Sequence, residues 1–124
     1  MATFLEDHPA VLEVSYPSLP SSPYHARATK YFPRGSGAII SVRVRGGLEA
    51  AKRVLARVRI FDYMVNVGDT KSLIVHPATS IHHGLSPEVQ QRAGVFDDTL
   101  RISVGTEDAN DLLRDLDQAL SATL

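Results

Sequence analysis

Apolar and polar residues alternate along two short segments, the pattern expected of a β-strand with one covered face. In residues 38–45 and again in residues 100–104, the aliphatic residues occupy every second position. Because successive side chains of a strand point to opposite faces, each segment would bury its aliphatic residues and present its arginines and serines on a wetter face. Two β-prone runs, at residues 11–14 and 60–67, and the apolar run that ends in His76-Pro77 predict three more strands.

Two longer segments carry apolar residues at helical spacing. In residues 48–58, leucine, alanine and valine recur every three or four positions among basic residues. Residues 106–120 repeat the pattern with the stripe Leu112, Leu113, Leu116, Ala119 and Leu120. Thr106, followed by acidic residues, predicts a cap for the second helix, because a hydroxyl satisfies free N–H groups and the helix dipole favours negative charge there. We interpret the apolar stripe of this helix as core rather than as a partner-binding seam.

Three shorter helices are predicted from turn and cap signals. Residues 3–7 resemble the last turn of a helix, ended by a His-Pro pair. Ser22 followed by proline predicts the start of a helix through residues 24–31, and Ser86 followed by proline predicts one at residues 86–92.

The order of these elements predicts an α+β, two-layer fold. Strands and helices alternate, which favours a small, mostly antiparallel sheet with helices packed on one face. A split βαβ, ferredoxin-like arrangement is the competing architecture. The length of 124 residues indicates a single domain, residues 1–124.

Composition and charge restrict the classes of function. A net charge of −1 gives no electrostatic reason to expect nucleic acid or an anionic membrane as a partner. The chain has no cysteine, which excludes a disulfide framework and thiolate catalysis. No apolar run reaches the length of a membrane span, so the sequence predicts a cytoplasmic protein with no membrane partner.

Two features in the second half of the chain could recognise a ligand. Asn66, Val67 and Gly68 end a β-prone run, and a glycine there permits a turn with positive φ and close approach of a ligand to the backbone. Arg101 is a lone arginine within an apolar strand, and its planar guanidinium matches a carboxylate in two-point geometry. From the residues alone, a plain turn is the favoured interpretation of Gly68, and for Arg101 a solvated side chain remains as open as a ligand-binding one.

The histidines and lysines do not add a second site. His76, His82 and His83 lack the spacing of a metal-binding motif, so no metal ligand is predicted. Of the three lysines, Lys71 lies nearest the turn, but the polar residues around it would not desolvate it as covalent catalysis requires.

Four ordered segments of the chain together resemble a known family. They read YPSLPSSPYH, SGAIISVRVRGG, VNVGDTKSLIVHPATSIHHGLSPE and LRISVGTEDANDLLRDLDQAL. They are similar to the carboxyl-terminal domain of the Cys/Met-metabolism family of pyridoxal-phosphate (PLP) enzymes. The wording Asn-Val-Gly-Asp is closest to the O-acetylhomoserine sulfhydrylase (homocysteine synthase) branch of methionine biosynthesis.

The resemblance implies roles for particular residues. Arg101 matches the family arginine that grips the α-carboxylate of the amino-acid substrate, and Asn66, Val67 and Gly68 match the segment that lines this carboxylate pocket. No catalytic residue of the family falls within the chain.

The resemblance also implies a supporting role for two residues after the turn. Ser72 and His76 match positions that help to hold the pocket loop. Ile81 departs from the family pattern, which usually has threonine there.

The chain lacks the family residue that binds the cofactor, and this limits the expected activity. The family lysine that binds PLP lies in a larger amino-terminal domain, in a Ser-x-Thr-Lys context that is absent here. The resemblance therefore implies a PLP-dependent transferase that forms C–S bonds, in which this chain would pair with an amino-terminal PLP domain within a homo-oligomer. The chain alone is expected to bind no PLP and to be inactive. The alternative is a stand-alone amino-acid-binding, structural or oligomerisation module.

Overall fold

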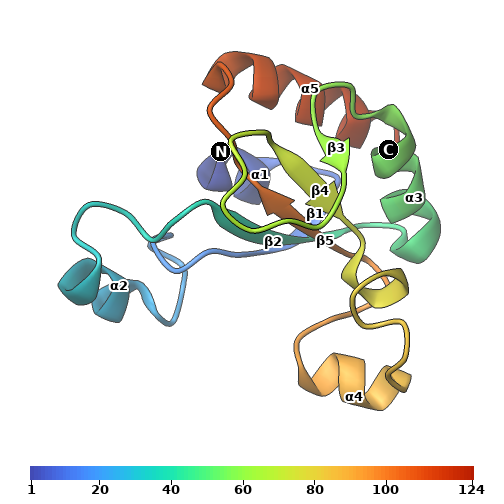
Figure 1. The fold of residues 1–124 in the computed structure, drawn as a ribbon, viewed down its shortest axis with the longest axis horizontal. Coiled ribbons are helices and arrows are strands. Elements are labelled where there is room, and N and C mark those ends of the chain that lie inside the picture. Colours follow the sequence, from blue (N-terminus) through green and yellow to red (C-terminus); the bar gives the residue numbers. More distant parts are fainter.

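Five strands form one sheet, and helices connect and cover them (Figure 1). The computed structural model describes residues 1–124. The strands are β1 (Val11–Ser15), β2 (Ile39–Val44), β3 (Asp62–Tyr63), β4 (Leu73–Val75) and β5 (Thr99–Ser103). The α-helices are α1 (Ala2–Asp7), α2 (His25–Tyr31), α3 (Gly47–Arg57), α4 (Pro87–Arg92) and α5 (Ala109–Ser121), and η1 (Pro77–Thr79) is a short 3-10 helix.

The sheet is mixed, with one parallel edge. Its strand order is β1-β2-β5-β4-β3, in which β1, β2, β5 and β4 pair antiparallel and β3 pairs parallel to β4. The predicted α+β fold with a mostly antiparallel sheet is therefore confirmed, with β3 as the exception. Residues 64–72, which connect the parallel pair β3 and β4, contain no helix. The strands β2 and β4, between which α3 lies in the chain, both pair antiparallel with β5, so they run parallel on its two sides as in a split βαβ unit.

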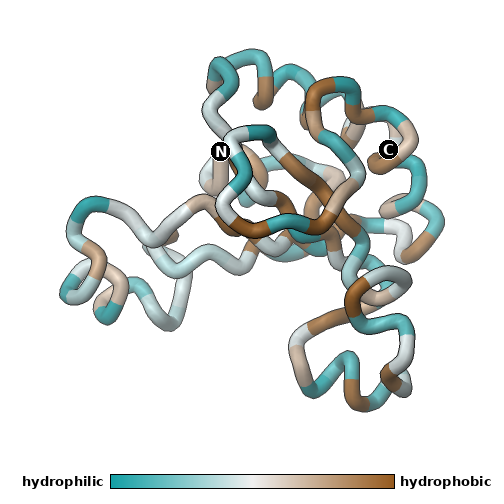
Figure 2. The backbone as a smooth tube through the Cα atoms, viewed as in Figure 1, coloured by the Kyte–Doolittle hydropathy of each residue, from teal (hydrophilic) through white to brown (hydrophobic).

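The alternating segments bury the side chains that the pattern predicts. Ile40, Val42 and Val44 on β2 are at most 4% exposed, and Leu100 and Ile102 on β5 are each 1% exposed. They join residues of α1, α3 and α5 in one cluster of 19 buried residues. Figure 2 shows this apolar concentration in the central strands, whereas the surrounding helices alternate between polar and apolar residues. Leu112, Leu116 and Leu120 of α5 are core, as predicted, whereas Leu113 is only partly buried and lies outside this cluster.

Two helix starts differ from the sequence prediction. Helix α5 begins at Ala109, and Asp108 caps it by accepting from the backbone N–H groups of Asn110 and Asp111; the predicted cap, Thr106, lies outside the helix. The predicted start of α2 at Ser22 was also wrong. The Ser22 hydroxyl accepts from Tyr24 N–H within a turn, which delays the helix to residue 25.

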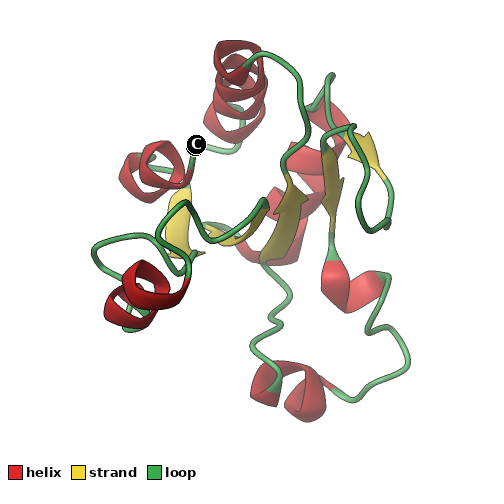
Figure 3. Ribbon diagram, turned by 60° about the vertical axis from the view of Figure 1, so that its left-hand side comes forward, coloured by secondary structure: helices red, strands yellow, loops and turns green.

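The strand predicted at residues 60–67 is shorter in the structure, where β3 contains only Asp62 and Tyr63. Beyond Tyr63 the chain leaves the sheet, because the polar residues that follow form hydrogen bonds within a turn of their own. Figure 3 shows this loop beside the edge of the sheet, and α4 at the end of long connections away from it. The longest helix, α5, has 13 residues, and no helix combines the length and apolarity needed to span a membrane.

Candidate functional site

Arg101 lies on β5, the central strand of the sheet, and one nitrogen of its guanidinium is buried without a hydrogen-bond partner. It pairs with Ser41 of β2 on one side and Val75 of β4 on the other. Its Nε is buried and has no hydrogen-bond partner, and no carboxylate of the chain forms an ion pair with it. A buried donor without an acceptor is costly, so the Nε of Arg101 is a position at which a further acceptor would be stabilising.

Arg43 shows what a satisfied arginine on the same face looks like. Its Nε and Nη2 donate to the two oxygens of Asp98 at 2.8 and 2.9 Å, and its guanidinium lies 4.0 Å from the centre of the Phe96 ring. The hydrogen bond to Asp98 raises the pKa of Arg43 above its ordinary value. Arg43 is therefore structural, since it is held by partners within the chain rather than solvated as the wetter strand face predicted, and of these two arginines only Arg101 is left for an external anion.

The turn at residues 66–69 is organised by its own polar groups. Asn66 Oδ1 accepts from the backbone N–H of Val67 at 2.8 Å, and Asn66 Nδ2 donates to Asp69 Oδ2 at 2.9 Å. Gly68 has a φ of +73°, which side chains disfavour, although a Cβ there would meet nothing within 4 Å. The backbone N–H of Lys71 donates to Asp69 and, with Asn66, holds the pKa of Asp69 below its ordinary value. The turn is thus preformed and fully exposed.

Ser72 attaches this turn to the segment that follows β5. Its backbone N–H donates to Glu107 Oε1 at 2.8 Å, and its hydroxyl donates to Glu107 Oε2 at 2.7 Å. Sequence reasoning placed Glu107 in the first turn of a helix and missed this contact. The only signal available was its acidic side chain just after an arginine-bearing strand, which does not identify a partner 35 residues away.

His76 ties the other end of β4 to the approach of β5. The side chain is 2% exposed, with Nε2 2.8 Å from the carbonyl oxygen of Asp97 and Nδ1 2.8 Å from Thr79 Oγ1. A carbonyl oxygen only accepts, so Nε2 carries the proton and Nδ1 accepts from the Thr79 hydroxyl. The imidazole is therefore fully bonded within the chain, and no group of three potential metal ligands gathers there or elsewhere.

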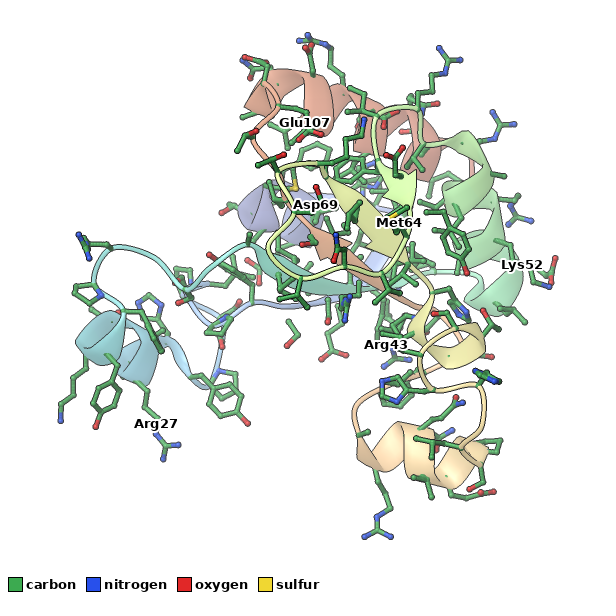
Figure 4. All side chains as sticks on the ribbon, in the orientation of Figure 1. Arg27, Arg43, Lys52, Met64, Asp69 and Glu107 are labelled. Carbon is green, nitrogen blue, oxygen red and sulfur yellow. The ribbon has the colours of Figure 1, made fainter.

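The strand register relates Arg101 to the turn. Leu73, the first residue of β4, lies opposite Ser103, and Ser103 shares a face with Arg101 two residues earlier. The segment that leads from the turn therefore enters β4 at the end where β5 finishes, and this end lies about 7 Å along the strand from Arg101. In Figure 4, Asp69 lies in the loop that crosses in front of β4 and β5. The loop that carries the exposed polar turn thus enters the sheet beside the strand that bears Arg101, and a guanidinium without a partner suits a small carboxylate ligand.

Sequence comparison places the chain in a family. Residues 1–121 match the family described as Cys/Met metabolism PLP-dependent enzyme, and the chain belongs to this family. An O-acetyl-L-homoserine sulfhydrylase of Thermus thermophilus is 45% identical over 98% of the chain, and an O-succinylhomoserine sulfhydrylase of Pseudomonas aeruginosa is 43% identical over 98%. The family resemblance predicted from the four sequence segments is confirmed.

Solved structures share the fold. A Campylobacter jejuni protein described as an O-acetylhomoserine (thiol)-lyase, solved with N'-pyridoxyl-lysine-5'-monophosphate, superposes with a TM-score of 0.92 at 39% identity over 97% of the chain. A cystathione gamma lyase from Micromonospora echinospora gives a TM-score of 0.88 at 38% identity. The chain covers 28% and 31% of those two chains, and 29% of the Thermus relative. It therefore spans less than a third of the length of these relatives.

Proposed function

We propose that this chain supplies the α-carboxylate-binding part of the substrate pocket of an O-acetylhomoserine sulfhydrylase-like, PLP-dependent enzyme. The observation that carries the proposal is the buried Nε of Arg101, which has no acceptor within the chain. The guanidinium offers a planar pair of donors to a carboxylate, and the turn at Asn66, Val67 and Gly68 provides the adjoining wall. The names of the relatives support an amino-acid ester as ligand, since O-acetyl- and O-succinylhomoserine both carry an α-carboxylate.

Within the reaction, the chain would bind and orient rather than react. A carboxylate gripped at two points cannot rotate about the guanidinium axis, so the remainder of the substrate is aimed in one direction. Ser72 and His76 would support this grip indirectly by holding the two ends of β4. We assign no proton transfer and no nucleophile to these residues.

The lysines of this chain do not suit the cofactor. PLP, when bound, supplies the electron sink for the chemistry and is held through a lysine. The side chain of Lys71 is 44% exposed and lies 4.0 Å from Asp62, the side chain of Lys52 is 57% exposed and pairs with Glu49, and Lys30 is exposed beside Tyr31. None is desolvated as a covalent lysine requires. We therefore propose that a further, PLP-binding domain holds the cofactor, in a homo-oligomer located in the cytoplasm.

The binding role is tested by titrating the chain with O-acetyl-L-homoserine and following the backbone amide signals by NMR. The expected dissociation constant is about 1 mM or weaker, because a half-open site recovers little of the entropy that association costs. The signals of residues 66–68 and 101 should move, and the α-carboxamide of the same compound should leave them in place. Replacing Arg101 by alanine should abolish the response, whereas replacing Arg92, an exposed arginine on α4, should not. Equal binding by the Arg101→Ala variant would refute the proposal.

The cofactor part is tested separately by mixing the chain with PLP. No new visible absorbance band that depends on Lys71 is expected. A band that disappears in the Lys71→Ala variant would show that the chain binds PLP covalently by itself.

A further inference from the structure

Five hydrogen bonds join the segment before β4 to the segment after β5. Besides the two bonds between Ser72 and Glu107, the backbone N–H of Gly105 donates to Ser72 Oγ at 2.8 Å, and the backbone N–H and the hydroxyl of Thr106 donate to the carbonyl oxygen of Thr70 at 2.9 and 3.3 Å. Ser72 is fully buried, and its hydroxyl both accepts and donates within this junction. The junction thus connects the strand that bears Arg101 to the loop that bears the turn.

The two segments approach so closely that only glycine fits between them. A Cβ on Gly105 would lie 2.3 Å from the carbonyl oxygen of Thr70, 2.5 Å from Ser72 N and 2.6 Å from Glu107 Oε2. These are the same groups that form the hydrogen bonds. The close approach and the bonds therefore depend on one another.

The turn has few other contacts to fix its position. Every residue from 62 to 71 is exposed, so the turn is not anchored by burial in the core. The pair between Lys71 and Asp62 is exposed and 4.0 Å long, which contributes little. The location of residues 66–68 relative to Arg101 must then depend chiefly on the junction at Ser72.

We propose that Glu107 and Ser72 are positioning residues that hold the Asn66–Gly68 turn at the distance from Arg101 that an amino-acid carboxylate requires. This inference rests on the proposed carboxylate-binding function. The ionised form of Glu107 suits this positioning role, because each of its two oxygens accepts a hydrogen bond from Ser72. The backbone N–H of Ser72 is the main cause of the lowered pKa of Glu107, so the charged form is the one that the junction favours. Glutamine at position 107 would keep only one acceptor oxygen.

The test compares two ligands of the 124-residue chain by NMR titration. Acetate offers a carboxylate to Arg101 alone, whereas O-acetyl-L-homoserine also reaches the turn. In the Glu107→Gln variant, the dissociation constant for O-acetyl-L-homoserine should rise on the order of tenfold, the factor expected for one charge-assisted hydrogen bond. The constant for acetate should stay unchanged. Ser72→Ala should repeat this pattern and serves as the second variant if Glu107→Gln does not fold.

A matched control excludes a general effect of losing a carboxylate. Glu49 lies on α3, bonds to Lys52 at 2.8 Å and has a pKa lowered by that bond, so Glu49→Gln makes the same chemical change away from the junction. It should leave both constants unchanged. If the unaltered chain binds neither ligand, the proposed function fails. If it binds both and the Glu107 and Ser72 variants bind O-acetyl-L-homoserine as tightly, or lose acetate equally, the positioning role is refuted while the proposed function stands.

Discussion

Arg43 and Arg101 project from the same face of adjacent strands, yet only Arg43 has acidic partners. Arg43 bonds Asp98 through two nitrogens, whereas Arg101 keeps a buried Nε without an acceptor. Two arginines in nearly the same setting thus separate into a structural residue and a residue available to a ligand. The two arginines differ in their neighbours. Residues 96–98, which come just before β5, supply the Phe96 ring and the Asp98 carboxylate to Arg43 and no partner to Arg101.

The ion pair between Arg43 and Asp98 should stabilise the fold. Asp98→Asn should lower the free energy of unfolding by about 2 kcal/mol, because it leaves a half-buried guanidinium without its charged acceptor. Urea denaturation followed by circular dichroism measures this. Asp97→Asn is the control, since the side chain of Asp97 is exposed and only its backbone carbonyl is used. Equal stabilities for the two variants would contradict a structural role for Asp98.

Arg101 should behave in the opposite way. Arg101→Leu should change the free energy of unfolding by less than about 0.5 kcal/mol, because it removes a charge that has no partner in the chain. Arg43→Leu, by contrast, should destabilise measurably. The same urea titrations compare them, and a loss for Arg101→Leu as large as for Arg43→Leu would show that Arg101 is a structural residue.

Two glycines should respond differently to alanine. Gly68→Ala should cost about 1 kcal/mol, because only its backbone conformation is disfavoured. Gly105→Ala should cost about 3 kcal/mol, because its Cβ would overlap backbone atoms of Thr70 and Ser72. Thermal and urea denaturation give both values. A loss of unfolding free energy well below this value for Gly105→Ala would mean that the two segments can move apart to accommodate the Cβ.

The pH dependence of stability follows from the lowered pKa of Glu107. A carboxyl with a folded-state pKa below its unfolded value of about 4.3 contributes stability above that pH, and this contribution is lost as the pH falls through the lowered value. The unaltered chain should therefore lose more stability between pH 6 and pH 3 than Glu107→Gln does. Asp69 is lowered in the same direction and remains in both proteins. Parallel pH profiles for the two proteins would contradict the ionised junction.

The sequence predicts those parts of the fold that depend on local pattern. Alternation in residues 38–45 and 100–104 identifies the buried side chains of β2 and β5, and the helical repeat identifies the core face of α5. The parallel edge is not visible in the pattern, because strand direction depends on how residues 64–72 return to the sheet.

The candidate site is predictable only in part for the same reason. Arg101 and Gly68 can be singled out by residue type and by family resemblance, but the Ser72–Glu107 junction links residues 35 positions apart. Thr106 illustrates the error that results. It has the composition of a helix cap, yet its backbone N–H is committed to Thr70, so Asp108 caps the helix instead.

The central claim is that the buried Nε of Arg101 donates a hydrogen bond to the carboxylate of a bound ligand. The most direct measurement is the 15Nε–H signal of Arg101 in the labelled chain during addition of O-acetyl-L-homoserine. The claim predicts that this signal shifts downfield and saturates in the millimolar range, while the corresponding signal of Arg43 stays in place. A signal from Arg101 that does not move at saturating ligand, or that moves no more than that of Arg43, would contradict it.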